Sequence, residues 1–423
     1  MYARLRLDIG WGDLLAGALA LAAARGRDRR QRRVEDLISA EGRFLCCLSV
    51  RSALDLYLQA VALPAGSEVL MTALNIPDMG KIVASHGLVP VPVDLDPETL
   101  APAPGAWLRA ASPRTRAVLV AHLFGCRTAL DDLAALARER GWLLLEDAAQ
   151  AYTGRAGLDR SAADASFVSF GLIKTATALA GALVRVADPG VLRRMREVQA
   201  RQPLQGRGDW ARRLVVAVAF KVLAWPPLFG AFVALCRLAG GDPDSLLRRT
   251  SRSFAGDDLL ARIRRRPSAA LLALLERRLR QSPEPRVRAR CRTASEILAR
   301  LPATLAPPGR RAPFDSHWVV PIRANDPARV ARALRGAGFD AATASSLAAL
   351  DPPSDRPELD PVAARRLLAA LVYLPAYPAL TARARERLVG ALVAAAAAAA
   401  AEPKVLKVSL SSSRRGADRR ADG

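Results

Sequence analysis

The segment 143–154, LLLEDAAQAYTG, places an aspartate and a glutamine directly after an apolar run. The run is typical of a buried strand, so Asp147 and Gln150 are expected at or just beyond its carboxyl end. A second strand-like run, ASFVSF, ends near Ser169 and is followed by Lys174. One strand end therefore offers a carboxylate, and another offers a hydroxyl and an amine.

This combination suits pyridoxal 5′-phosphate. The cofactor needs a lysine for a Schiff base, an acid at its pyridine nitrogen and donors for its phosphate. Lys174, Asp147 and Ser169 fit these three roles in that order, and Gln150 could reach the 3′-oxygen or the face of the ring. Lys174 would also be the general base of the proton shift. Taken singly, such an aspartate is more often a helix cap and such a lysine a surface residue, so the prediction depends on their joint order.

Strand-like and helical segments alternate from Phe44 to about Val186. This alternation predicts an α/β fold in which helices sandwich a mostly parallel sheet, and ligands bind beyond the carboxyl ends of its strands. Asp94 and His122 are expected at such ends too. The strand-like runs are 68–73, 89–94, 116–123, 142–147 and 165–170, and the helical segments between them are 52–63, 77–87 and 128–141.

The chain has 423 residues, so a large and a smaller domain are expected. A helix from Asp13 to about Ala24, capped by Asp13, is favoured over a signal peptide because the basic run follows the apolar one. The expected division is an N-terminal helical segment (1–43), a large cofactor-binding domain (44–194), an apolar insertion (195–260), a small α/β C-terminal domain (261–408) and a disordered tail (409–423).

The composition argues against several other classes of protein. The chain has five cysteines, none of them in a CxxC pair, and three histidines. These counts argue against a Cys/His metal site and against a disulfide framework. They favour a reducing, cytoplasmic location. The net charge of +23 comes mostly from arginines spread over many segments. No basic stretch is studded with aromatic residues, so nucleic acid is not an expected partner.

The segment 212–241 is almost continuously apolar, but Lys221 and the pair Pro226-Pro227 interrupt it. Each half is shorter than the roughly 20 residues that a membrane-spanning helix needs. Two alternatives stay open: a buried helical hairpin, or an interfacial hairpin whose flanking arginines contact anionic head groups. The second would place the protein at the inner face of the membrane.

Six stretches carry a resemblance to a known family. They are SALDLYLQAVALPAGSEVLMTALNIP, HGLVPVPVDLDPETL, SPRTRAVLVAHLFGC, LLLEDAAQAYTG, SFVSFGLIKTATALAGALV and ALVYLPAYPALTARARERLVGAL. In this order they resemble the DegT-type aminotransferases, sugar aminotransferases of the aspartate-aminotransferase superfamily with fold type I. The aspartate box and the lysine box together are the specific part of the resemblance.

The resemblance implies that Lys174 forms the Schiff base, that Asp147 pairs with the pyridine nitrogen, that Gln150 lies near the ring and that Ser169 lies on the phosphate. Lysine rather than histidine at 174 favours transamination over dehydration. The family implies a homodimer, glutamate as amino donor and a nucleotide-linked keto-sugar as acceptor, in polysaccharide or secondary-metabolite biosynthesis.

Several positions depart from the family pattern. Ser49, Val50 and Arg51 replace its S-G-T phosphate loop, and Arg51 would clamp the phosphate as a charged donor. Ile76 replaces the aromatic residue that stacks on the ring and is expected to cover its face less well, and Gly171 replaces a histidine. The expected activity is therefore amino transfer to a keto-sugar or to another, lipid-linked carbonyl. The alternative is an inactive or regulatory relative with a membrane-binding or partner-binding role.

Overall fold

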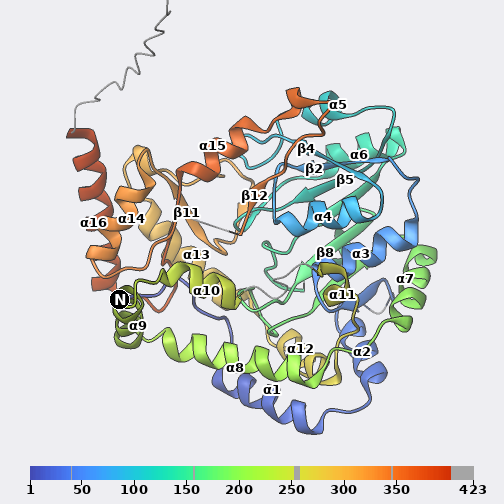
Figure 1. The fold of residues 1–423 in the computed structure, drawn as a ribbon, viewed down its shortest axis with the longest axis horizontal. Coiled ribbons are helices and arrows are strands. Elements are labelled where there is room, and N and C mark those ends of the chain that lie inside the picture. Colours follow the sequence, from blue (N-terminus) through green and yellow to red (C-terminus); the bar gives the residue numbers. More distant parts are fainter. Residues whose placement is uncertain (40, 156–157, 252–257, 344–345, 402–423) are drawn as a thin grey trace, which may run out of the picture.

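A computed structural model of the chain describes residues 1–39, 41–155, 158–251, 258–343 and 346–401. A seven-stranded sheet with the order β1-β9-β8-β7-β5-β2-β4 forms its centre (Figure 1). Strands β8, β7, β5, β2 and β4 are parallel, and β9 is antiparallel to both β8 and β1. The expected fold class is confirmed. The strands are β1 (Phe44–Cys47), β2 (Glu68–Thr72), β4 (Val89–Val93), β5 (Thr115–Ala121), β7 (Leu143–Asp147), β8 (Ala165–Ser169) and β9 (Ala182–Val186).

Helices bury both faces of this sheet, which explains why its strands are continuously apolar. Successive residues of a strand point to opposite faces, so Met71 joins one core cluster and Leu70 joins the other. The first cluster lies under α3 (Val50–Val61), α4 (Pro77–Ser85) and α7 (Pro189–Arg201), and the second lies under α5 (Ala106–Ala110) and α6 (Asp131–Arg140).

A separate core lies where the small C-terminal domain is expected. Its strands β11 (Val320–Arg323) and β13 (Leu371–Leu374) pair antiparallel. Phe339, Leu388 and Ile297 are among its fully buried members. The helices of this part of the chain are α13 (Glu284–Leu298), α14 (Pro327–Gly336), α15 (Val362–Ala370) and α16 (Ala382–Ala401).

Two short antiparallel pairs join this part of the chain to loops of the large sheet. One pairs β6 (Cys126–Arg127) with β10 (Phe314–Asp315), and the other pairs β3 (Leu74–Asn75) with β12 (Ala348–Ala349). Both β3 and β6 follow the carboxyl ends of parallel strands. The C-terminal part of the chain therefore covers the edge of the sheet where ligands of such folds bind.

The apolar segment 212–241 forms two helices, α8 (Arg207–Leu223) and α9 (Pro226–Leu238). Their axes are bent by 103° at the break. The expected helical hairpin is therefore wrong, because Pro226 begins a new helix that turns away from the first after the break. Trp210 of α8 lies in one core cluster, and Phe220 at the other end of α8 shares a second cluster with Phe229 of α9.

The remaining helices lie between these parts of the chain. The helix α1 (Trp11–Ala23) begins after Gly10, so the expectation that Asp13 caps it is wrong. Asp13 lies in the first turn, and its carboxylate accepts a hydrogen bond from the Gly10 N–H at 3.1 Å. The others are α2 (Arg27–Asp36), α10 (Pro243–Ser251), α11 (Leu259–Ile263) and α12 (Ala269–Arg280). The predicted tail, 409–423, lies outside the described residues.

Candidate functional site

Asp147 is the last residue of β7, at the carboxyl end of the strand as its sequence predicts. Its side chain is buried, and its Oδ1 accepts a hydrogen bond from the Ala149 N–H at 2.9 Å. Burial raises the pKa of this carboxyl, and the positive charges of Lys174, His122 and Arg51 act in the opposite direction. The buried carboxylate therefore lies within electrostatic reach of several basic side chains.

Lys174 lies in the turn after β8, where its backbone N–H donates to the Gly171 carbonyl at 3.0 Å. Strand β8 is the parallel neighbour of β7, so the two strand ends bring Lys174 and Asp147 together. Burial lowers the pKa of the Lys174 amine to about 8, against the opposing pull of the Asp147 carboxylate. The lysine therefore carries a far larger fraction of neutral, nucleophilic amine near neutral pH than a surface lysine does.

Trp318 covers this amine, although it was not among the site residues predicted from the sequence. The Lys174 Nζ lies 3.9 Å from the centroid of the indole ring, and the indole Nε1 donates to the Ile173 carbonyl at 3.0 Å. Gly125 allows the approach: a Cβ there would lie 2.7 Å from both Ser316 Oγ and the Trp318 backbone nitrogen. An aromatic residue shortly before a strand of the C-terminal part was the only signal in the sequence.

Ser169 and Gln150 lie beside these groups but are already hydrogen-bonded. The Ser169 Oγ accepts the Gly171 N–H at 3.3 Å, within the turn that carries Lys174. The Gln150 Oε1 accepts the Phe124 N–H at 2.9 Å, in the loop before Gly125. The amide NH₂ of Gln150 is therefore the group left to donate toward a cofactor. Both roles stay predictions.

The predicted phosphate site lies at the N-terminus of α3. Ser49 caps this helix, and its Oγ accepts the Ser52 N–H at 3.1 Å. A helix N-terminus favours an anion, because its backbone N–H groups and dipole point outward. The Arg51 Nε lies 2.6 Å from Asp78 Oδ2, so the predicted phosphate clamp is held by an ion pair with the first turn of α4.

Ile76 is the residue predicted to cover the face of the cofactor ring. It stands immediately before α4, and its half-buried side chain packs against the core cluster under α3 and α4. A branched aliphatic side chain can fill such a position between helices, whereas an aromatic ring would be needed to stack on a cofactor. Its predicted role as a cover of the ring stays a prediction.

His122 and Asp94 have structural partners. The His122 Nδ1 accepts the Thr128 N–H at 3.1 Å, which assigns its Nε2 as the donor to Glu146 Oε1 at 2.8 Å. The Glu146 carboxylate also accepts from two serine hydroxyls, and these bonds with the histidine lower its pKa to about 2. Asp94 caps α15 by accepting the N–H groups of Ala363 and Ala364 at 2.8 and 2.9 Å.

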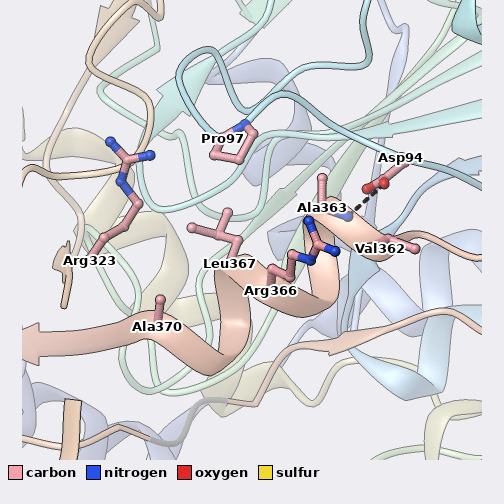
Figure 2. Close-up of a pocket in the computed structure, with 8 residues that line it drawn as sticks. All are labelled: Asp94, Pro97, Arg323, Val362, Ala363, Arg366, Leu367 and Ala370. Carbon is pink, nitrogen blue, oxygen red and sulfur yellow. Dashed lines mark hydrogen bonds between the residues drawn. The ribbon is translucent and has the colours of Figure 1, made fainter. Parts of the chain in front are cut away.

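Asp94 also lines an open pocket of about 510 Å³ between the end of β4 and α15 (Figure 2). Two arginines line it, and one of them, Arg323, is paired with Glu98 at 2.6 Å. The residues that line this pocket include no lysine, and its one carboxylate already caps a helix. The chemistry predicted from the sequence therefore belongs to the Lys174–Asp147 region and not to this pocket.

The residues around Lys174 fit pyridoxal 5′-phosphate. A half-buried lysine whose amine has a lowered pKa and a buried carboxylate lie at neighbouring strand ends, and these are the groups that the carbonyl and the ring nitrogen of this cofactor require. Arg51 influences the pKa of both groups, so the end of α3 that is predicted to bind the phosphate lies near the same site. The fit rests on these three side chains.

We expect the reaction of Lys174 with an aldehyde to depend on pH in a defined way. Only the neutral amine is nucleophilic, and its pKa is lowered to about 8. Below that pH the rate of covalent trapping by pyridoxal 5′-phosphate and borohydride should fall by about tenfold per pH unit, and above it the rate should level off. A rate that keeps rising to pH 10, as for an ordinary lysine, would contradict the burial of this amine.

Comparison with known proteins gives a partial sequence match and a full-length match of fold. The sequence model of the DegT/DnrJ/EryC1/StrS aminotransferase family matches residues 40–217. A relative from Micromonospora echinospora, L-glutamine:2-deoxy-scyllo-inosose aminotransferase, is 37% identical over 145 residues, which cover 34% of each chain. The chain thus matches about a third of the length of this relative.

Two solved structures are similar over nearly the whole chain. The aminotransferase TlmJ from Streptoalloteichus hindustanus has a TM-score of 0.67 at 21% identity, and the match covers 95% of this chain and 100% of that one. Spr1654 from Streptococcus pneumoniae, a sugar aminotransferase by description, was solved in a PLP-form. It has a TM-score of 0.66 at 15% identity, with 93% and 98% covered. At these identities the similarity establishes the fold.

Proposed function

Because residues 40–217 match the sequence model of the DegT/DnrJ/EryC1/StrS aminotransferase family, we propose that this protein is a pyridoxal 5′-phosphate-dependent aminotransferase. The observation that carries the proposal is the half-buried Lys174, whose amine has a lowered pKa, near the buried Asp147 carboxylate. A structural lysine would be expected in a full ion pair or on the surface, whereas a reactive one needs a neutral fraction at working pH.

Each residue of the candidate site has a separate role in the proposed reaction. Lys174 Nζ would hold the cofactor and would act as the general base that moves a proton on the substrate. The Asp147 carboxylate would pair with the ring nitrogen, and the N-terminus of α3 with Arg51 would hold the phosphate. When bound, the cofactor supplies a reactive carbonyl and an electron-withdrawing ring. Trp318 covers the lysine and excludes water from it.

We infer the finer points of the reaction from the relatives. The amino donor is glutamate or glutamine, because the matched relative from M. echinospora uses L-glutamine by name. The acceptor is a keto-sugar or a related cyclic ketone, and the working form is a homodimer. A lipid-linked acceptor is a narrower proposal, supported by the exposed apolar side chains of α8 and α9 next to the sheet domain.

Covalent trapping tests the proposal directly. The purified protein should gain a visible absorption band with pyridoxal 5′-phosphate, and borohydride should fix the cofactor to the peptide that contains Lys174. Lys174→Ala should lose both signals. Lys81→Ala is the matched control, because Lys81 is exposed and is another of the five lysines of the chain. A wild type without the band would favour the alternative of an inactive or regulatory relative.

A further inference from the structure

The outer face of α1 is apolar along its whole length. A helix at the surface of a soluble protein normally turns charged and polar residues outward. In α1 the exposed fraction of Leu19 is 63%, and no exposed residue of the helix is polar. The exposed residues are Trp11, Gly12, Leu15, Ala18, Leu19, Ala22 and Ala23.

The helices α8 and α9 continue this feature. Their exposed large side chains are Val215, Val218, Val222, Leu228, Leu235 and Leu238, with Trp225 between the helices, and the exposed fraction of Leu238 reaches 86%. We call these side chains, together with Trp11, Leu15 and Leu19 of α1, the apolar face. Isolated exposed apolar residues are ordinary, but a set this large on neighbouring helices marks an interaction site.

The helices that carry the apolar face are packed together. The Trp210 indole of α8 donates to the Gly17 carbonyl of α1 at 3.2 Å. Farther along α8, the Lys221 Nζ lies 5.3 Å from the centroid of the Trp11 ring and donates to the Ile9 carbonyl at 2.6 Å. Figure 1 shows α1 and α8 side by side along one edge of the molecule, with α9 at the end of α8. The apolar face is therefore built on a fixed surface.

The same helices are anchored to the protein on their other sides. Trp210 and Ala217 of α8 are buried in one core cluster, and Phe229 and Val233 of α9 are buried in another. Within the described ranges, no single helix is long and apolar enough to cross a membrane, and only the bent pair α8–α9 passes by length and composition. A helix pair with one docked side and one exposed apolar side fits an interface better than a span.

Basic side chains surround the apolar face. Arg25, Arg29, Arg32 and Arg33 are exposed on the segment that directly follows α1. Between residues 207 and 238 three arginines are exposed, Arg207, Arg212 and Arg237, and the one acidic residue, Asp209, is paired with Arg265 at 3.0 Å. Arginines beside an apolar helix face are the arrangement that binds anionic lipid head groups.

We propose that the apolar face lies in the head-group region of a membrane that contains anionic lipid, and holds the protein there as a peripheral, non-spanning protein. Anionic lipid is favoured over a second copy of the chain because two copies meeting at this face would bring their arginines together, and equal charges at a shared interface repel. This property goes beyond amino transfer and does not depend on it.

Vesicle binding by the full-length protein tests the proposal. Wild-type protein should sediment with vesicles of phosphatidylcholine and phosphatidylglycerol, and at least about tenfold less with phosphatidylcholine alone. The variant Leu15→Ser/Leu19→Ser/Leu235→Ser/Leu238→Ser should bind the anionic vesicles at least about tenfold more weakly, because it removes exposed apolar area and no core contact. Arg29→Gln/Arg32→Gln/Arg33→Gln should weaken binding and reduce its dependence on salt.

A matched control separates the apolar face from apolar surface in general. Leu108, Val362 and Val393 are exposed apolar residues of other helices. Leu108→Ser/Val362→Ser/Val393→Ser should bind vesicles as the wild type does. Equal binding by the wild type and the apolar-face variant would overturn the proposal. So would a wild type that ignores vesicles but loses its dimer when the apolar face is changed, because the face would then join two copies. Trapping of cofactor at Lys174 reports on amino transfer separately.

Discussion

Lys174→Ala should abolish amino transfer. Proton transfer by a positioned general base contributes roughly 10²- to 10⁴-fold to a rate, and the substitution also removes the covalent attachment of the cofactor. The expected result is a loss of at least that size in the single-turnover formation of keto acid from glutamate or glutamine. The loss should exceed that of Asp147→Asn, for which we expect roughly 10²- to 10³-fold, the range for one preorganised electrostatic group.

Two controls distinguish lost chemistry from lost structure. Asp147→Asn should still trap the cofactor at Lys174, because it keeps the amine and the shape of the site. Added methylamine should restore part of the activity of Lys174→Ala, since a small free amine can occupy the vacated space and act as the base. Unchanged activity in Lys174→Ala would reject the proposed role of this lysine, and an unfolded Lys174→Ala would show in its far-UV spectrum.

The sheet was predictable from the sequence because its strands are buried on both faces. Continuous apolar runs such as 68–73 and 165–170 end within one residue of the observed β2 and β8. The positions of Asp147 and Lys174 follow from the same logic, since parallel neighbours end at the same edge of the sheet. Local sequence patterns were therefore sufficient to predict that Asp147 and Lys174 lie close together.

The rest of the site depends on contacts between distant parts of the chain. Trp318 reaches Ile173 across 145 positions of sequence, and its loop passes Gly125 only because that glycine has a φ of 116°. The run 317–324 has the composition of a strand, but β11 begins only at Val320. The ion pair between Arg51 and Asp78 joins two helices in the same way. Hydrophobic periodicity carries no information about such pairs.

Two predictions from local patterns were wrong for a similar reason. Asp13 is a residue type that often caps helices, but it lies in the first turn of α1, where Arg277 and Arg278 form ion pairs with its carboxylate, each at 2.7 Å. The run 212–241 has the composition of a hairpin, but its two helices diverge. In both cases contacts with distant parts of the chain determine the local structure.

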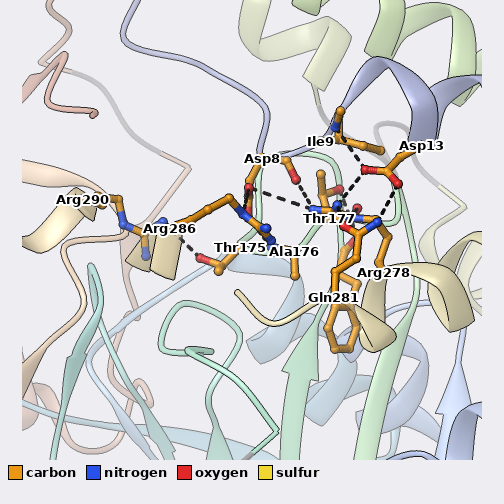
Figure 3. Close-up of polar contacts among 12 residues, drawn as sticks. Asp8, Ile9, Asp13, Thr175, Ala176, Thr177, Arg278, Gln281, Arg286 and Arg290 are labelled. Carbon is orange, nitrogen blue, oxygen red and sulfur yellow. Dashed lines mark hydrogen bonds and ion pairs between the residues drawn. The ribbon is translucent and has the colours of Figure 1, made fainter. Parts of the chain in front are cut away.

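Arg278→Met should lower the free energy of unfolding by about 3–5 kcal/mol, because it breaks the more deeply buried ion pair of Asp13 and also removes the donor to two backbone carbonyls. The exposed fraction of the Arg278 side chain is only 2%. Its guanidinium donates to Asp13 Oδ2 at 2.7 Å, to the Asp8 carbonyl at 2.5 Å and to the Thr177 carbonyl at 3.0 Å (Figure 3). Urea unfolding of both proteins measures the difference.

Arg277→Met is the matched control. Arg277 contacts the same carboxylate, but 49% of its side chain is exposed, so its loss should cost about 1 kcal/mol or less. Equal costs for the two variants would contradict the assignment of Arg278 as the buried partner. A double-mutant cycle with Asp13→Asn tests the same assignment. In the background of Arg278→Met, Asp13→Asn should restore part of the lost free energy of unfolding, and in the background of Arg277→Met it should restore little.

The position of Arg278 connects this stability to the candidate site. Thr177 and Ala176 lie in the loop after Lys174, where Ala176 has a φ of 54° and Leu179 has a φ of 67°. Each left-handed residue other than glycine costs roughly 1–2 kcal/mol, so outside contacts must hold the loop in place. Asp8 Oδ2 accepts the Ala176 N–H at 2.7 Å, and Arg278 binds the backbone carbonyls of both Asp8 and Thr177 (Figure 3). Arg278→Met should therefore slow the trapping of cofactor at Lys174 under conditions where the protein is still folded, whereas Arg277→Met should leave that rate unchanged.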